Sequence, residues 1–574
     1  MQSELIPPFE GANLTNYEDM CKEFTWASLE KEFEWSNGAP YNIAYEAIDR
    51  HAKGWRKNKI AIYWEGADGS TKKYTFREMQ METNRFANAL LKLGTKKGDR
   101  VFVYLDRIPE LYIAAIGTIK MGAIVGPLFS ALGPDGVKDR LLDAGARTLV
   151  TTPELYRRIQ PTLDELTELS NIIVVTDDEK LVPTGCISFN EFISSCSPDF
   201  RPVSMDPNDP YVVHYTSGTT GKPKGVLLGH KSMIQQFFTS RIVLDLQEED
   251  TYWCTADPGW VTGTSYGIIG PWLLGASIVS YEGRFDARVW YRILEKYGIT
   301  VWYTAPTALR MLMKAGDDIV KEFDLSKLRH ICSVGEPLNP EVVRWGVRVL
   351  KKRIHDTWWQ TETGAMLICN YPCQNIKPGS MGRPIPGVQA AVVDDDGQEL
   401  PPGREGYLAI RPGWPSMMVG IWRNAPKYRE YFRIPGWYVA GDMAYRDEEG
   451  YFWFLGRADD VIKSSGERIG PFEVESVLLE HPAVAEAGVI GKPDEIRGEI
   501  VKAFISLRPG FTPSEELKED IAHFVKQKLA AYAYPREIEF VDRLPKTRSG
   551  KILRRVLRAR ELGLDVGDLS TLEE

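Results

Sequence analysis

A glycine-rich run between two apolar segments sets the first restriction on the fold of this chain. The run, residues 216–225, contains three glycines, four hydroxyl side chains and two lysines. Glycine permits backbone shapes that other residues resist, so consecutive amide groups can turn toward one anion. Residues 211–213 and 226–228 are apolar and typical of short buried strands. The chain is therefore expected to pass from strand to strand through a loop that can surround a phosphate.

The spacing within this run argues against an ordinary P-loop. A P-loop has four residues between its glycines, a lysine followed by Ser or Thr, and a helix directly afterwards. Here two residues separate Gly218 from Gly221, and Lys222 is followed by Pro223. A flexible Gly/Thr linker is the alternative, because linkers often have this composition. Lys-Pro-Lys in a strand-loop-strand setting favours a nucleotide triphosphate site.

Composition limits the class of protein and its partners. The 574 residues are 43% hydrophobic and 26% charged, which is typical of a globular protein with roughly two to four domains. A net charge of −9 with scattered basic residues argues against nucleic acid as a partner. The N-terminus lacks the features of a signal peptide, and the apolar stretch 111–129 is interrupted by Lys120 and Pro127. We expect a cytoplasmic protein without a membrane span.

The seven cysteines follow no repeated spacing, so free buried thiols are expected. Cys369 and Cys373 could bind a metal together, but no second Cys or His pair stands at the spacing of a zinc site. The sequence therefore does not predict structural zinc.

The order of strand-like and helical stretches predicts the fold class. Residues 101–105 are strand-like, 109–120 helical and 123–125 strand-like again, which is the pattern of a mostly parallel sheet. Alternating apolar and polar residues over 384–411 indicate a β-rich subdomain. We expect an α/β protein with a large N-terminal domain, residues 1–458, of layered α/β subdomains plus this β-rich one.

A small mobile α+β domain is expected at residues 459–574. Residues 472–479 are helical in pattern and 485–491 strand-like. An amphipathic helix is predicted over 515–529, with Leu517, Ile521, Phe524, Val525 and Leu529 on one face.

Several short segments carry the residue types that adenylation chemistry needs. Residues 335–337, Gly-Glu-Pro, follow an apolar strand, where open α/β sheets bind ligands, although a plain turn is the alternative. In the run 356–364, adjacent Trp358 and Trp359 point to opposite faces, so that one can be core and the other can line a pocket; both could also be core. Glu362 offers the oxygen ligand that Mg²⁺ prefers.

Further charged residues could contact a nucleotide. Asp442 is predicted to end a strand, where it could accept the ribose hydroxyls or simply be solvated. Arg457, the segment 465–468 and the basic loop 545–551 offer groups for phosphate, although such residues are more often on the surface.

Taken together and in this order, these segments resemble the acyl-adenylate-forming superfamily, over nearly the whole chain. Within it, residues 257–263 and 356–359 are most similar to those of the AMP-forming acetyl-CoA synthetases of the shorter bacterial and archaeal type. The resemblance implies an acetate–CoA ligase that converts ATP, acetate and CoA to AMP, pyrophosphate and acetyl-CoA through an acetyl-adenylate. ATP, Mg²⁺ and CoA would be required, and a ligase for propionate or another short-chain or aromatic acid is the alternative.

The resemblance also implies the roles of individual residues at the nucleotide. ATP or AMP would be bound by Thr216, Ser217, Gly218, Thr219, Thr220, Gly221, Lys222, Lys224, Gly335, Glu336, Pro337, Asp356, Thr357, Trp358, Gln360, Thr361, Asp442, Arg457 and Arg468. Catalysis would depend on Lys551, Arg468, Glu362 and Thr361, with Glu362 holding the metal.

The acyl pocket would be formed by Val261, Thr262, Val334 and Trp359. An indole across the pocket floor leaves room for one or two carbons, and each extra methylene is worth about 1–3 kcal/mol of discrimination. Acetate should react best, propionate weakly and butyrate not at all.

The two half-reactions would use one site twice, with the C-terminal domain swinging about Asp459. CoA would contact Gly466, Arg157, Arg158 and Lys526, although for the last three an ordinary surface charge is at least as plausible. A lysine acetyltransferase and a deacetylase acting on Lys551 are possible partners. A catalytically silent nucleotide-binding protein would be expected to lose Lys551, Glu362 or Arg468, and all three are present. The physiological direction and the oligomeric state stay open.

Overall fold

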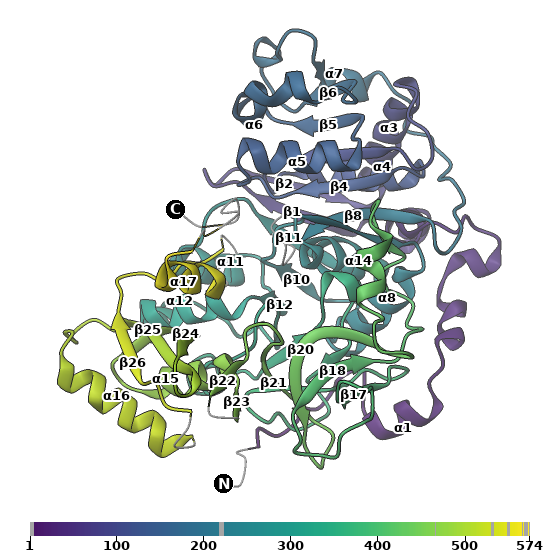
Figure 1. Cartoon of the computed structure of the whole chain (residues 1–574). Coiled ribbons are helices and arrows are strands. Elements are labelled where there is room, and N and C mark those ends of the chain that lie inside the picture. The colour runs from purple at the N-terminus through teal and green to yellow at the C-terminus, as the bar shows by residue number, and fades with distance from the viewer. Residues whose placement is uncertain are drawn as a thin grey trace.

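The computed structural model describes residues 5–216, 223–464, 467–529, 533–547, 552–564, 566 and 572, without the side chains of Glu467 and Arg468. Within these ranges three sheets organise the chain (Figure 1). Two of them belong to the part of the chain that precedes residue 459, and the third lies after it.

One sheet contains the two strands that flank the glycine-rich run. Its strands are, in spatial order, β19 (Gly420–Ile421), β9 (Lys224–Gly229), β8 (Pro210–Thr216), β4 (Ile124–Leu128), β3 (Arg100–Tyr104), β5 (Thr148–Thr151), β6 (Asn171–Val174) and β7 (Ile187–Ser188). Strands β8 and β9 are antiparallel, with Thr216 opposite Lys224. The predicted strand-loop-strand unit is confirmed.

The apolar stretch 111–129 is a helix followed by a strand, as predicted. Helix α4 (Pro109–Lys120) leads into β4, which is parallel to β3. Among the described residues, no helix has both the length and the apolar character needed to cross a bilayer.

The second sheet is mostly parallel in one half, where only the edge strand is antiparallel to its neighbour, and antiparallel in the other half. Its spatial order is β17 (Ala390–Val393), β18 (Gly406–Ile410), β20 (Tyr438–Arg446), β21 (Phe452–Arg457), β16 (Ser380–Pro384), β15 (Ile368–Cys369), β14 (Ile354–Trp358), β13 (His330–Ser333), β12 (Val301–Thr304), β10 (Thr251–Cys254), β11 (Ser277–Tyr281), β1 (Ile60–Glu65) and β2 (Thr71–Thr75). Pairing is parallel from β14 through β1 and antiparallel from β14 to β17. The predicted β-rich segment is therefore joined edge to edge to the parallel strands through β15.

One predicted strand boundary is wrong. Strand β20 continues past Asp442 to Arg446, and Asp442 pairs with Arg457 in the middle of the hairpin β20–β21. The apolar run from Trp437 to Ala440 marked the beginning of the strand but not its length.

Helices cover the sheets and supply the remaining core. The longer ones in this part are α3 (Phe76–Lys92), α5 (Pro134–Ala144), α8 (Ser232–Ile242), α11 (Ala287–Lys296) and α12 (Pro306–Ala315), followed by the shorter α13 (Pro340–Trp345). The N-terminus of α3 is closed by a capping box, in which Thr75 and Glu78 satisfy each other's backbone amides.

The C-terminal part is α+β, as predicted. Its sheet has the order β23 (Glu467–Ile469), β22 (Ile462–Ser464), β25 (Gly498–Leu507) and β24 (Val484–Asp494), with β26 (Glu537–Phe540) parallel to β25. Helices α15 (Pro471–Glu480), α16 (Glu515–Lys528) and α17 (Arg554–Leu562) accompany it. Ile521 and Val525 of the predicted amphipathic helix are fully buried. The fold class is confirmed, and the boundary at residue 459 stays a prediction.

Candidate active site

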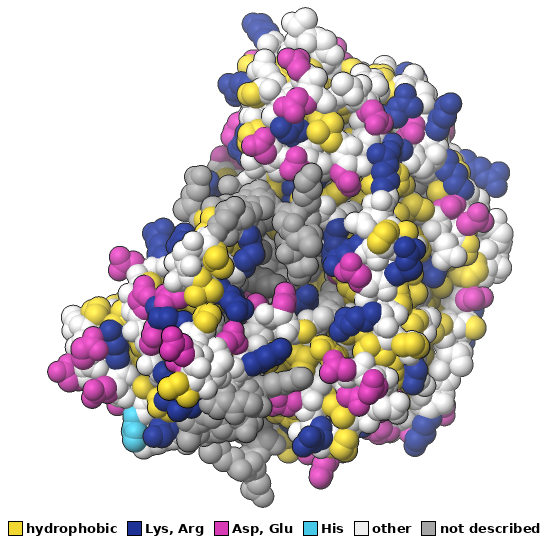
Figure 2. Space-filling model, viewed as in Figure 1, with side chains coloured by type: hydrophobic (Ala, Val, Ile, Leu, Met, Phe, Trp, Pro, Cys, Tyr) yellow, Lys and Arg dark blue, Asp and Glu magenta, His cyan; other side chains and the backbone are white. Residues whose placement is uncertain are grey.

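Figure 2 shows a hollow near the centre of the view, with Lys and Arg side chains at part of its rim. Contacts between residues far apart in the sequence join the β8–β9 unit, the end of β14 and the hairpin β20–β21 into one site.

Lys224 and Glu362 form an ion pair across this site. Lys224 begins β9, and its Nζ lies 2.8 Å from Oε1 of Glu362, in the short turn η10 (Thr361–Thr363). Tyr431 donates its hydroxyl to the same carboxylate oxygen at 2.6 Å and accepts a hydrogen bond from Lys224. Burial alone would raise the pKa of Glu362, but the charge of Lys224 and the two hydrogen bonds lower it. The carboxylate is therefore ionised and available to a hard cation.

Among the described side chains, Trp358, Gln360 and Arg457 hold Asp442. Its Oδ2 accepts hydrogen bonds from Trp358 Nε1 and Gln360 Nε2, both at 3.0 Å, and its Oδ1 accepts one from Arg457 NH1 at 3.0 Å. Tyr438 donates to Gln360 Oε1 at 2.7 Å, which fixes the orientation of the amide. The buried carboxylate is thus oriented in advance and paired with a guanidinium.

Residues at the ends of β13 and β14 form the expected border of an adenine. Gly335 has φ of +94°, a conformation that favours glycine. The Glu336 carboxylate accepts from Thr307 N at 2.7 Å and from Arg310 at 2.9 Å, which fixes the turn against α12. Asp356 is buried, and burial raises its pKa to about 7, although its Oδ1 accepts a hydrogen bond from the amide of Thr357.

Three of the four residues expected at the acyl pocket share one cluster of packed side chains. Val334 belongs to its buried core, and Val261 and Trp359 pack against that core. The indole of Trp359 donates to the hydroxyl of Tyr303 at 3.2 Å and makes a T-shaped contact with the ring of Tyr266, with 5.1 Å between the ring centroids. Trp358 instead donates to Asp442, so the two indoles contact different partners, and their roles at a nucleotide and an acyl group stay predictions.

Two glycines fix the segment that carries Val261 and Thr262. A Cβ on Gly259 would lie 2.3 Å from the backbone nitrogen of Phe129, and one on Gly263 would lie 2.2 Å from the carbonyl oxygen of Asp257. Only glycine allows this close approach, which places the start of α9 (Val261–Thr264) at the pocket.

Two family models match the chain. The model of AMP-binding enzymes matches residues 48–422, and that of the AMP-binding enzyme C-terminal domain matches residues 473–551. The chain belongs to the AMP-binding enzyme family. It is 59% identical to an acetyl-coenzyme A synthetase of Bacillus subtilis over the full length of both chains. An acetyl-coenzyme A synthetase of Methanothrix thermoacetophila is 44% identical, with 94% of this chain and 86% of the relative covered.

Solved structures of similar proteins show the same fold. The anthranilate CoA ligase AuaEII in complex with anthranoyl-AMP has a TM-score of 0.83 at 34% identity, covering 91% of this chain and 97% of that one. An acyl-CoA synthetase of Brucella canis has a TM-score of 0.75 at 37% identity, covering 96% and 99%. The resemblance seen in the sequence is confirmed.

In this AMP-binding enzyme, the predicted hinge follows directly on Arg457. Asp459 Oδ1 lies 3.9 Å from Arg457 Nε, so the same arginine contacts both Asp442 and Asp459. The adjoining Asp460 lies 4.0 Å from Arg554 at the start of α17. The segment that contains the predicted hinge is therefore linked by charge to Asp442, through Arg457, and to α17 of the C-terminal part.

The residues predicted for CoA are not brought together. Arg157 and Arg158 lie on α6 (Pro153–Ile159), where they donate to the carbonyls of Pro153 and Ser130. Lys526 lies on α16 over the ring of Tyr534. Helices α6 and α16 are at opposite ends of the molecule in Figure 1. In this arrangement the three side chains cannot meet one phosphate.

Several predicted site residues lie outside the described part of the chain. They are Ser217, Gly218, Thr219, Thr220, Gly221, Lys222, Gly466, Lys551 and the side chain of Arg468. Thr216 and Lys224, which border the glycine-rich run, are described, and they are opposite each other in the β8–β9 ladder.

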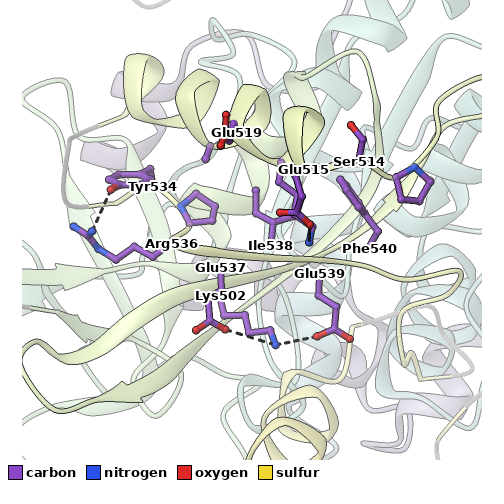
Figure 3. A pocket seen from close by; sticks show the side chains of 14 residues that line it. Lys502, Ser514, Glu515, Glu519, Tyr534, Arg536, Glu537, Ile538, Glu539 and Phe540 are labelled. Atoms are coloured by element: carbon purple, nitrogen blue, oxygen red, sulfur yellow. Dashed lines mark hydrogen bonds and ion pairs between the residues drawn. The ribbon is translucent and has the colours of Figure 1, made fainter.

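Two further features are not part of the contacts that form this site. His330, Cys332 and His355 are buried on β13 and β14 with potential ligand atoms within 4.8 Å of one another, an arrangement that sequence spacing missed because it joins neighbouring strands. His330 Nε2 lies 2.8 Å from the carbonyl of Val243 and His355 Nδ1 lies 3.2 Å from that of Ile331. A groove of about 790 Å³ between α16 and β26 is shown in Figure 3, and the residues that line it include none of the predicted site residues.

Proposed function

We propose that this protein joins acetate to CoA at the expense of ATP, forming acetyl-CoA, AMP and pyrophosphate. The observation that carries this conclusion is the 59% identity, over the whole length of both chains, to an acetyl-coenzyme A synthetase. The protein is an acid–thiol ligase and uses ATP, Mg²⁺ and CoA.

The reaction takes place in two steps. An oxygen of the acetate carboxylate attacks the α-phosphorus of ATP, and pyrophosphate leaves with the electrons of the broken P–O bond. The CoA thiolate then attacks the carbonyl carbon of the acetyl-adenylate, and AMP leaves. The mixed anhydride is already activated, so the second step needs no enzyme nucleophile.

We assign the nucleotide contacts from the site described above. Lys224 and the glycine-rich run bind the β- and γ-phosphates, Asp442 the ribose, and residues 335–337 with Asp356 and Thr357 the adenine. Support comes from residues 335–337, Asp356 and Thr357, which lie at or directly after the ends of the parallel neighbours β13 and β14, where open α/β sheets bind ligands. Asp442 lies within β20 and is oriented by Trp358, Gln360 and Arg457. Thr361, Arg468 and Lys551 would stabilise charge at the α-phosphate and carboxylate oxygens.

Glu362 would hold the metal. Its carboxylate is buried, ionised and within reach of Lys224, and an anionic oxygen suits Mg²⁺. When bound, Mg²⁺ neutralises phosphate charge. This chain supplies the oriented carboxylate, with Tyr431 and Lys224 fixing its Oε1.

We assign acetate selectivity to Trp359 together with Val261, Thr262 and Val334. The support is the packing of the indole against Tyr303 and Tyr266, which leaves a large aromatic ring beside the other pocket residues. A longer acid would have to displace this ring.

The proposed regulation of the protein is based on the chemistry of a lysine side chain. Acetylation of Lys551 by an acetyltransferase, reversed by a deacetylase, would remove a positive charge needed in the first step. We also propose that residues 459–574 swing about Asp459 between the two steps, and that the protein acts in the cytoplasm.

Exchange of pyrophosphate into ATP with acetate, propionate, butyrate and benzoate, followed by CoA-dependent release of AMP, tests the proposed function. Acetate should support the fastest exchange and propionate a slow one. Exchange that is fastest with butyrate or benzoate would overturn the assignment of substrate.

A further inference from the structure

The indole that closes the acyl pocket is anchored by a tyrosine from the neighbouring strand. Trp359 Nε1 lies 3.2 Å from the hydroxyl of Tyr303, on β12. Tyr303 is fully buried, whereas Trp359 is half-buried. A rigid side chain thus holds one that could otherwise turn.

The hydrogen bonds around Tyr303 run in one direction. Thr357 Oγ1 donates its proton to the carbonyl of Ser333 at 2.7 Å, so toward Tyr303, 2.8 Å away, it can only accept. Tyr303 must then donate to Thr357 and accept from Trp359, whose indole N–H can only donate. The order of donation is Trp359 to Tyr303 to Thr357 to Ser333.

This chain links the two substrate sides of the site. Thr357 belongs to the expected adenine border, and Trp359 to the expected acyl pocket. Tyr266 also restrains the indole, through a T-shaped contact in which the planes of the two rings lie at 80°. The Tyr266 hydroxyl is itself fixed by hydrogen bonds to the hydroxyl of Thr239 at 2.7 Å and to the amide of Met366 at 2.8 Å.

We propose that Tyr303 is a positioning residue that sets acyl chain-length selectivity by fixing the indole of Trp359. The inference rests on the proposed function, because it takes Trp359 as the floor of the acyl pocket. Tyr303 acts through the hydrogen bond to the indole and does not touch the acid itself.

Removal of the hydroxyl should loosen the floor of the pocket. The buried side of the indole would lose the acceptor for its N–H, and an unpaired polar group is unfavourable in the interior. Because Trp359 is half-buried, its N–H can regain a partner by turning toward solvent. The ring would then leave room for the next methylene.

The test compares Tyr303→Phe with Tyr371→Phe. Tyr371, which follows β15, is also fully buried, and its hydroxyl donates to the carbonyl of Arg383 at 3.3 Å, so the control loses a comparable group away from the indole. The readout is kcat/KM for propionate divided by kcat/KM for acetate in ATP–pyrophosphate exchange. We expect this ratio to rise about threefold to tenfold in Tyr303→Phe, as for one lost hydrogen bond, and to stay unchanged in the control.

A double-mutant cycle shows whether the effect passes through the indole. In Trp359→Phe, which has no indole N–H, adding Tyr303→Phe should leave the ratio unchanged. Thr357→Val tests the same chain without altering the Tyr303 ring and should raise the ratio in the same direction.

Two results would overturn the inference. One is a propionate-to-acetate ratio that stays at the wild-type value in both Tyr303→Phe and Thr357→Val. The other is a change on adding Tyr303→Phe that is as large in the Trp359→Phe protein as in the wild type. If Tyr303→Phe does not fold, the Thr357→Val ratio decides alone. Wild-type protein without acetate-dependent exchange would instead refute the proposed function.

Discussion

Lys224 and Glu362 lie 2.8 Å apart, and their ion pair joins the strand that leaves the glycine-rich run to the turn that follows β14. Without nucleotide, each charge compensates the other. In the proposed function, Lys224 would bind phosphate oxygens and Glu362 would bind Mg²⁺, so each side chain would exchange one ionic partner for another when MgATP binds. The ion pair would therefore hold both side chains in place before the nucleotide binds.

The charge of Glu362 should be needed for the first half-reaction. Glu362→Gln keeps the size of the side chain but removes the charge that would hold Mg²⁺. We expect kcat/KM for ATP to fall by about 10²–10³, as for loss of one preorganised charged group. Measuring exchange over a range of Mg²⁺ concentrations checks the cause, because the half-saturating Mg²⁺ concentration should rise. A variant with normal Mg²⁺ dependence would remove Glu362 from the metal site.

Tyr431 should contribute through its hydroxyl. Tyr431→Phe removes the hydrogen bond to Glu362, which is 2.6 Å long, but keeps the ring that stacks on Tyr438. A hydrogen bond to a charged group is worth about 1.5–3 kcal/mol, so KM for ATP should rise by about tenfold or more. Tyr428→Phe, on α14 (Ala425–Glu430), is the control. Equal KM values for all three proteins would contradict this role.

Asp356 should make stability depend on pH. Its folded pKa of about 7 lies above the ordinary value of 3.8, so in the folded state it keeps a proton that the unfolded chain has lost. The contribution of this group to stability is therefore present at low pH and lost as the pH rises through about 7. Asp356→Asn should gain free energy of unfolding relative to wild type as the pH rises from 5 to 8. Chemical denaturation at several pH values measures the difference in free energy of unfolding between the two proteins. A difference that stays constant from pH 5 to 8 would contradict the raised pKa of Asp356.

Gly259 should tolerate no side chain. A Cβ there would meet backbone atoms of Phe129, so Gly259→Ala requires a backbone shift and should cost about 2–4 kcal/mol. Gly133→Ala is a matched control, since no heavy atom lies within 4 Å of its Cβ position. If Gly259→Ala and Gly133→Ala lower the midpoint of thermal unfolding equally, the close approach at Gly259 does not contribute to stability.

Local sequence patterns predicted the helices and strands well, but they could not predict contacts between residues far apart in the sequence. The strands beside the glycine-rich run, helix α4 and helix α16 follow from apolar periodicity, because each depends on neighbouring residues. Asp442 was predicted to end a strand because it follows the short apolar run Trp437–Ala440, whereas the strand continues to Arg446 through pairing with β21.

The supporting tyrosines were missed for the same reason. Tyr303, Tyr431 and Tyr438 reach the site from segments far from residues 357–362 in the sequence, and a tyrosine in an apolar strand gives no sign of where its hydroxyl points. Motifs identify groups that meet the substrate, while the residues that orient those groups become visible only when strands are neighbours in space.

The most direct test of acetate activation compares exchange of labelled pyrophosphate into ATP for wild type and Trp359→Gly, with acetate and with butyrate. Wild type should be active with acetate and inactive with butyrate, and Trp359→Gly should gain activity with butyrate as the floor of the pocket is removed. Exchange by wild type that is faster with butyrate than with acetate, or a chain-length preference that Trp359→Gly leaves unaltered, would contradict the account.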